Sequence, residues 1–62
     1  MYLEIRIVMD NAAFEFPNGQ EVAHILRDFA AEIEEYDMQP GYGKSLLDIN
    51  GNWIGSVLVR GE

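Results

Sequence analysis

Few residues of this chain have side chains suited to catalysis. There is one histidine, His24, and there are no cysteines, whereas catalysis requires a nucleophile with a base, paired acids in a pocket, or a metal. On a helix, His24 would project away from the apolar positions and lie one turn before Asp28, which predicts an exposed side chain in a weak ion pair. Ser45 and Ser56 have no histidine near them in the sequence. We therefore predict no catalytic residues and no enzymatic activity.

The segment Asp48-Ile49-Asn50-Gly51-Asn52 has the alternation of carboxylate and amide residues that opens a calcium-binding EF-hand loop. Such a loop also needs glycine at its sixth position and glutamate at its twelfth, where this chain has Trp53 and Val59. Asn-Gly between two apolar runs instead predicts a β-hairpin turn. We predict no metal site and no cofactor.

Acidic residues form a stripe on a predicted helix. The stripe projects within about a 60° arc beside the apolar face and continues around the C-terminal end; its members are Glu21, Asp28, Glu32 and Glu35, followed by Glu34 and Asp37. Carboxylates near a helix C-terminus oppose the helix dipole, and like charges at i,i+4 spacing repel. Because this placement costs stability, it favours a surface that binds a basic partner. The alternative is the solvated face of an acidic protein.

The length of the stripe suggests which basic surface it fits. At about 1.5 Å per residue, the distance from Glu21 to Glu35 is roughly 21 Å. One strand of a DNA duplex carries a phosphate about every 3.4 Å, so the stripe spans about six phosphates. A row of carboxylates would then occupy the basic site through which a partner protein contacts the phosphates of DNA. Tyr42, in a glycine-rich loop, and Trp53 are candidate apolar anchors, although Trp53 is also a candidate for the small core.

The composition limits the classes of protein that fit. The chain has 62 residues and a formal net charge of −7, from 11 acidic and four basic residues. This charge argues against direct binding to nucleic acid or to an anionic membrane, since both require basic patches. No apolar run approaches the roughly 20 residues that cross a bilayer, and residues 1–6 alternate, unlike a signal peptide. We expect a soluble, cytoplasmic protein without disulfides.

The elements that position these residues follow from periodicity. Residues 2–9 alternate as a half-buried strand, and residues 20–36 carry apolar side chains at helical spacing. Residues 37–44 are predicted as a loop, and residues 45–49 and 52–60 as two strands around Asn50-Gly51. Residues 12–16 fit either a loop or a short strand. The order β-α-β-β predicts one α+β domain over residues 1–62, with one amphipathic helix on one face of an antiparallel or mixed sheet of three or four strands.

Several segments together resemble small proteins of phages and other bacterial mobile elements. They are residues 10–14 (DNAAF), 21–23 with 25–27 (EVA and ILR), and 48–52 with 54–55 (DINGN and IG). The short, acidic chain without a catalytic set is also similar to anti-CRISPR inhibitors of type I effector complexes. That resemblance implies a protein of the host bacterial cytosol that binds a subunit of the effector complex (Cascade) and excludes DNA.

A second function is compatible with the same sequence. The chain would then be a small regulatory or accessory interaction module without nucleic-acid mimicry, using an exposed sheet edge or an apolar patch. Such a module could be homodimeric, although the sequence alone favours a monomer.

Overall fold

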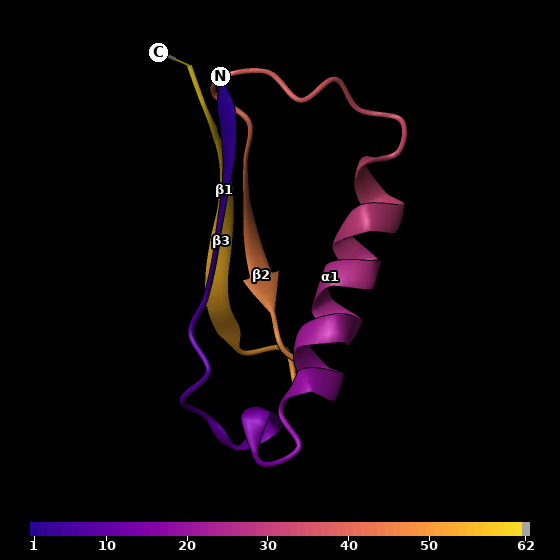
Figure 1. The fold of residues 1–62 in the computed structure, drawn as a ribbon, viewed down its shortest axis with the longest axis vertical. Coiled ribbons are helices and arrows are strands. Elements are labelled where there is room, and N and C mark those ends of the chain that lie inside the picture. The colour runs from indigo at the N-terminus through magenta and orange to yellow at the C-terminus, as the bar shows by residue number, and fades with distance from the viewer. Residues whose placement is uncertain (62) are drawn as a thin grey trace.

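The structure, a computed structural model, describes residues 1–61 and consists of one helix packed on one face of a three-stranded sheet (Figure 1). The strands are β1 (Tyr2–Ile7), β2 (Gly43–Leu47) and β3 (Trp53–Arg60), and the helices are α1 (Gly19–Ile33) and the short 3-10 helix η1 (Ala12–Phe14). The sheet order is β1-β3-β2, and both pairs are antiparallel. The predicted α+β fold is confirmed, with the last strand in the centre of the sheet.

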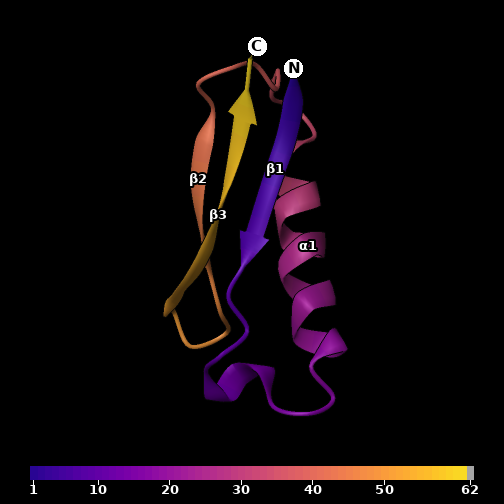
Figure 2. The ribbon, with the colours of Figure 1, turned by 60° about the vertical axis from the view of Figure 1, so that its left-hand side comes forward.

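The sheet has an inner face toward α1 and an outer face away from it (Figure 2). In β1, alternation places Leu3 and Ile5 opposite Val59 and Val57 of β3, on the inner face. Both valines are buried, as expected for the central strand. The outer face carries the other set, including Tyr2, Glu4 and Arg6 of β1 and Leu58 of β3, and no element covers it within residues 1–61.

The core lies between α1 and the part of the sheet formed by β2 and β3. Its buried side chains come from η1, α1, β2 and β3, and they are Phe14, Ile25, Phe29, Leu46, Ile54 and Val57. No side chain of β1 belongs to this buried set, although Ile7 packs against its edge. The buried core is therefore built from two of the three strands.

The buried carboxylate of Asp48 organises the loops at one end of the molecule. Its side chain is 6% exposed. One oxygen accepts the backbone N–H groups of Asn50 (2.8 Å) and Asn52 (2.9 Å), and the other accepts the side-chain amides of Asn11 (2.8 Å) and Asn52 (3.3 Å). Asp48 thus closes the β2–β3 turn and ties this turn to the segment before η1. The Asp-x-Asn-x-Asn pattern is a hairpin turn, as predicted.

The loops decide between the two alternatives for residues 12–16 and shift the bounds of one predicted strand. Residues 12–16 contain no strand, because the side chain of Asn11 accepts the N–H of Ala13 (2.9 Å) and starts a 3-10 turn. Strand β2 occupies residues 43–47 instead of 45–49, since Asp48 uses its hydrogen bonds for the turn. At the start of α1, Asn18 makes no side-chain cap, and the carboxylate of Glu21 accepts a hydrogen bond from the N–H of Ile49 (3.1 Å).

Gly55 provides the first test of the fold. A Cβ atom at this position would lie 1.9 Å from the carbonyl oxygen of Arg6, because β1 and β3 approach closely there. Gly55→Ala is expected to lower the free energy of unfolding by about 1–3 kcal/mol, since backbone must move to relieve the overlap. Gly19→Ala is the matched control, because a Cβ there meets nothing within 4 Å. Equal stability of the two variants in denaturant titrations would contradict the β1–β3 packing.

Asp48 provides the second test. Hydrogen bonds from the backbone of Asn52, and then from Asn50, lower the pKa of Asp48 below its usual range. Its stabilising contribution is therefore complete above a pH of about 4–5 and is lost as the pH falls through the lowered folded-state pKa. Asp48→Asn is expected to have a lower Tm at pH 7, because its amide would oppose those of Asn11 and Asn52. The difference in Tm from the wild type should shrink on acidification; a difference independent of pH would refute this role.

Candidate functional site

Three carboxylates of the predicted acidic stripe make contacts within the fold. Glu32 forms an ion pair with Lys44 of β2 at 2.7 Å, and this hydrogen bond raises the pKa of Lys44. Asp28 lies 3.3 Å from His24, which is the weak i,i+4 pair that the spacing predicted. The carboxylate of Glu21 accepts a hydrogen bond from the backbone N–H of Ile49. Glu32 attaches α1 to the sheet and Glu21 attaches it to the hairpin, whereas the pair of Asp28 with His24 lies within α1. The continuous row of free charge predicted along the helix is therefore interrupted.

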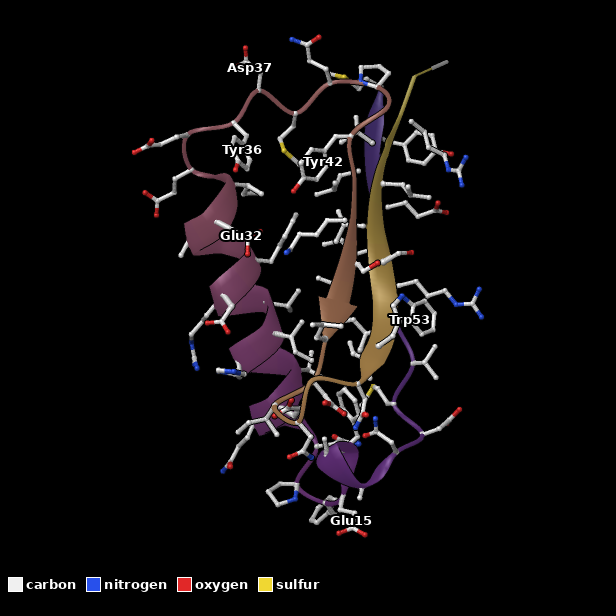
Figure 3. The ribbon with its side chains drawn as sticks, turned by 180° about the vertical axis from the view of Figure 1, so that it is seen from behind. Glu15, Glu32, Tyr36, Asp37, Tyr42 and Trp53 are labelled. Carbon is white, nitrogen blue, oxygen red and sulfur yellow. The ribbon has the colours of Figure 1, made fainter. Side chains whose placement is uncertain are left out.

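The other three carboxylates of the stripe gather beyond the last turn of α1. We name Glu34, Glu35 and Asp37 the acidic helix end. All three are exposed, and within residues 1–61 none of them makes an ion pair or a side-chain hydrogen bond. In Figure 3, Asp37 projects away from the body of the molecule. The acidic helix end is therefore the part of the stripe whose charges are available to a partner.

The acidic helix end is unfavourable for the stability of α1. The helix ends at Ile33, Glu34 is its C-cap residue, and its last turn holds no basic residue. The C-terminal carbonyl groups carry a partial negative charge, so each adjacent carboxylate costs about 0.3–1 kcal/mol at low ionic strength. A lysine or arginine at these positions would instead stabilise the helix. Selection for stability alone does not account for this arrangement.

Two tyrosines lie beside the acidic helix end. Tyr36 is 57% exposed, and Tyr42 is half-buried against the core. Their ring centroids are 6.4 Å apart with an interplanar angle of 48° (Figure 3). The sequence predicts Tyr42 as an exposed contact, and the structure instead makes it the support for Tyr36. Helical spacing places Tyr36 on the buried arc; it is exposed because α1 ends three residues earlier, where Glu34 and Glu35 already disfavour the helix.

Trp53 lies away from the acidic helix end. Its side chain is 59% exposed at the start of β3, on the side of the sheet opposite α1 (Figure 3). The prediction that Trp53 packs in the core is therefore wrong: β3 turns its neighbour Ile54 into the core instead. The outer face also carries Arg6 and Arg60, and Arg60 pairs with Glu4 at 2.9 Å.

The described residues contain neither a cluster of metal ligands nor a helix that could span a membrane. No group of three or more histidine, aspartate or glutamate side chains within residues 1–61 is arranged to hold a metal ion. No helix in this part of the chain has the length and apolar character needed to cross a membrane. A comparison of the chain with protein-family models, curated proteins and solved structures found no match.

The energetic cost of the acidic helix end can be measured directly. Glu34→Gln with Glu35→Gln should raise the free energy of unfolding by about 0.5–2 kcal/mol at low salt, because both changes remove charge that opposes the helix dipole. The control is Asp10→Asn with Glu15→Gln, which removes the same charge near η1, at the opposite end of the molecule (Figure 3). Equal stabilisation by both pairs would attribute the effect to net charge and not to the helix end.

Proposed function

We propose that this chain is a non-catalytic inhibitor that binds a basic, nucleic-acid-binding surface of a partner protein and thereby blocks recognition of DNA. The contact surface is the acidic helix end, with the ring of Tyr36 beside it. Glu32 and Asp28 contribute to the field from the adjoining turns but remain attached to Lys44 and His24.

The observation that carries the proposal is the retention of three exposed carboxylates where the helix dipole opposes them. They have no ion-pair partner in the described part of the chain. Their negative electrostatic potential therefore extends into the solvent, where a binding partner meets it. A net charge of −7 strengthens that field and speeds encounter with a basic surface. The same charge opposes direct contact with nucleic acid. A partner with clustered lysines and arginines fits best.

Tyr36 supplies the apolar part of such a contact. Tyrosine is enriched at the energetically dominant positions of protein interfaces, since it combines a large ring with a polar hydroxyl. Tyr42 supports the ring from the core side, which limits the conformational entropy lost on binding. The carboxylates would therefore set the orientation and rate of docking, and Tyr36 would slow dissociation.

The class of partner follows from the resemblance to inhibitors of type I CRISPR effector complexes. Such a complex holds target DNA on a basic surface of a Cascade subunit, in the bacterial cytoplasm, and this surface has the chemistry that the acidic helix end requires. The row of carboxylates that would stand in for DNA phosphates is shorter than the whole stripe predicted from the sequence. Only the carboxylates of the acidic helix end make no side-chain contact within the described residues. The inhibitor would thus cover a local contact site for DNA.

The proposal can be tested with purified type I effector complexes and a labelled target duplex. Excess wild-type chain is expected to reduce DNA binding by at least about tenfold in apparent affinity, whereas Glu34→Gln with Glu35→Gln should lose most of this effect. Asp10→Asn with Glu15→Gln should inhibit like the wild type, because the charge it removes is distant from the contact surface. Absence of inhibition across the complexes, or equal inhibition by both double variants, would rule out the proposed surface.

A further inference from the structure

Strand β1 leaves one set of backbone groups open at the edge of the sheet. The N–H of Val8 donates to the carbonyl of Ile54, and the N–H of Val59 donates to the carbonyl of Tyr42 in the segment leading into β2. Backbone groups alternate in direction along an antiparallel strand. The even-numbered residues of β1 therefore face β3, and Leu3, Ile5 and Ile7 direct their N–H and C=O groups outward. Such an edge is ready to pair with another strand.

The inner face beside this edge is apolar and incompletely covered. Leu3 is 45% exposed and Ile5 is 40% exposed, although both point to the helix side of the sheet. Leu26 of α1 is 39% exposed. In Figure 2, β1 and α1 border the side of the molecule away from β2. We name these three partly exposed side chains, which come from the inner face of β1 and from α1, the apolar strip.

The acidic residues of α1 lie on its other flank. Asp28 and Glu32 line a groove with Lys44 and Leu46 of β2. A projection of about 100° per residue places Leu26 about 120° around the helix from Glu32, toward β1. A molecule that covers the apolar strip would meet Leu26 and the inner face of β1 without approaching the carboxylates of Asp28 and Glu32.

We infer that the open edge of β1 pairs with β1 of a second copy of this chain, antiparallel and centred on Ile5. In that register Ile5 faces the partner's Ile5 and Leu3 faces the partner's Ile7, and their outward backbone groups form about six hydrogen bonds. On the outer face, Glu4, which also pairs with Arg60 of its own chain at 2.9 Å, faces the partner's Arg6, and this arrangement occurs twice because of the two-fold symmetry. The apolar strips of the two copies meet on the inner face.

Charge selects this register over its neighbours. The outward N–H and C=O groups of the two strands must face one another. The nearest alternative registers are therefore displaced by two residues of the partner strand. A slip in one direction places Glu4 opposite the partner's Glu4, and a slip in the other places Arg6 opposite the partner's Arg6. Like charges directly across a strand pair are destabilising. The alternation of β1 is therefore complementary to itself in one register, which is the reason for naming a second copy as the occupant.

The dimer also keeps the strongest negative charges apart. The C-terminal end of α1 lies at the same end of the molecule as the N-terminus of β1 (Figure 1). Antiparallel pairing of β1 with its copy reverses the direction of the second helix, so the two acidic helix ends point in opposite directions along the dimer. The two three-stranded sheets become one sheet with both helices on the same face. This inference is independent of the proposed inhibitor function and would give any partner two equivalent binding surfaces.

The test uses the full chain and two single variants, Glu4→Arg and Arg6→Glu, in sedimentation equilibrium. The wild type should associate to twice its 7.0 kDa mass, with a dissociation constant below about 1 mM. Each variant alone places like charges across the pair and should weaken association at least about tenfold. An equimolar mixture of the two should recover dimer, because one chain then carries arginine at both positions and faces glutamate at both positions of the other. Arg27→Glu, a change of equal charge on exposed helix surface, is the control and should associate like the wild type.

Amide hydrogen exchange identifies the edge that is used. The N–H groups of Leu3, Ile5 and Ile7 should be protected only at concentrations at which the dimer forms. Three results would overturn the inference: a wild type that stays monomeric at about 1 mM, association unaffected by either variant, or variants that remain dissociated when mixed. A dimer whose Ile5 amide exchanges as fast as in the monomer would equally overturn it.

Discussion

The rest of the structure depends on how one short helix covers a three-stranded sheet. Helix α1 is 15 residues long and buries two of its side chains, Ile25 and Phe29, against β2 and β3. A domain of 62 residues has little apolar surface to spare, so the position of this helix decides which strands are covered. The pair between Glu32 and Lys44 ties α1 to β2, and the bond from Ile49 to Glu21 ties it to the β2–β3 turn. The buried core draws on β2 and β3, and Leu3 and Ile5 of β1 stay partly exposed.

This arrangement gives the two flanks of α1 different roles. On the β2 side, acidic residues are used to attach the helix, and their charge is partly neutralised. On the β1 side, the surface is apolar and adjoins an open strand edge. In the described part of the chain, the acidic helix end, which lies beyond Ile33, is attached neither to β2 nor to β1. The apolar strip, the flank that attaches α1 to β2 and the acidic helix end are separate surfaces. This separation would let the chain associate with itself through the apolar strip while it binds a basic partner through the acidic helix end.

Much of the fold could be predicted because each element has its own period. The alternation of residues 2–9, the helical spacing after Gly19 and the turn at Asn50-Gly51 determine the element order, and burial of Val57 and Val59 follows from their apolar run. The limits of the elements were less predictable, because side chains distant in sequence set them: Asn11 and Asp48 are 37 residues apart and hydrogen-bonded. The division of the acidic stripe was equally hidden, since only the fold brings Lys44 to Glu32. From the sequence, Trp53 is a candidate both for the core and for a contact surface; in the structure it is exposed, and its neighbour Ile54 is buried.

The proposed contact between the acidic helix end and a basic surface depends on charge. The most direct measurement of this dependence is the affinity of the chain for a type I effector complex between about 50 and 300 mM monovalent salt. The proposed contact predicts that the affinity falls steeply across this range, and that the slope of log affinity against log salt becomes shallower when Glu34 and Glu35 are replaced by glutamine. An affinity that does not change with salt, or a slope that is the same for both proteins, would contradict it.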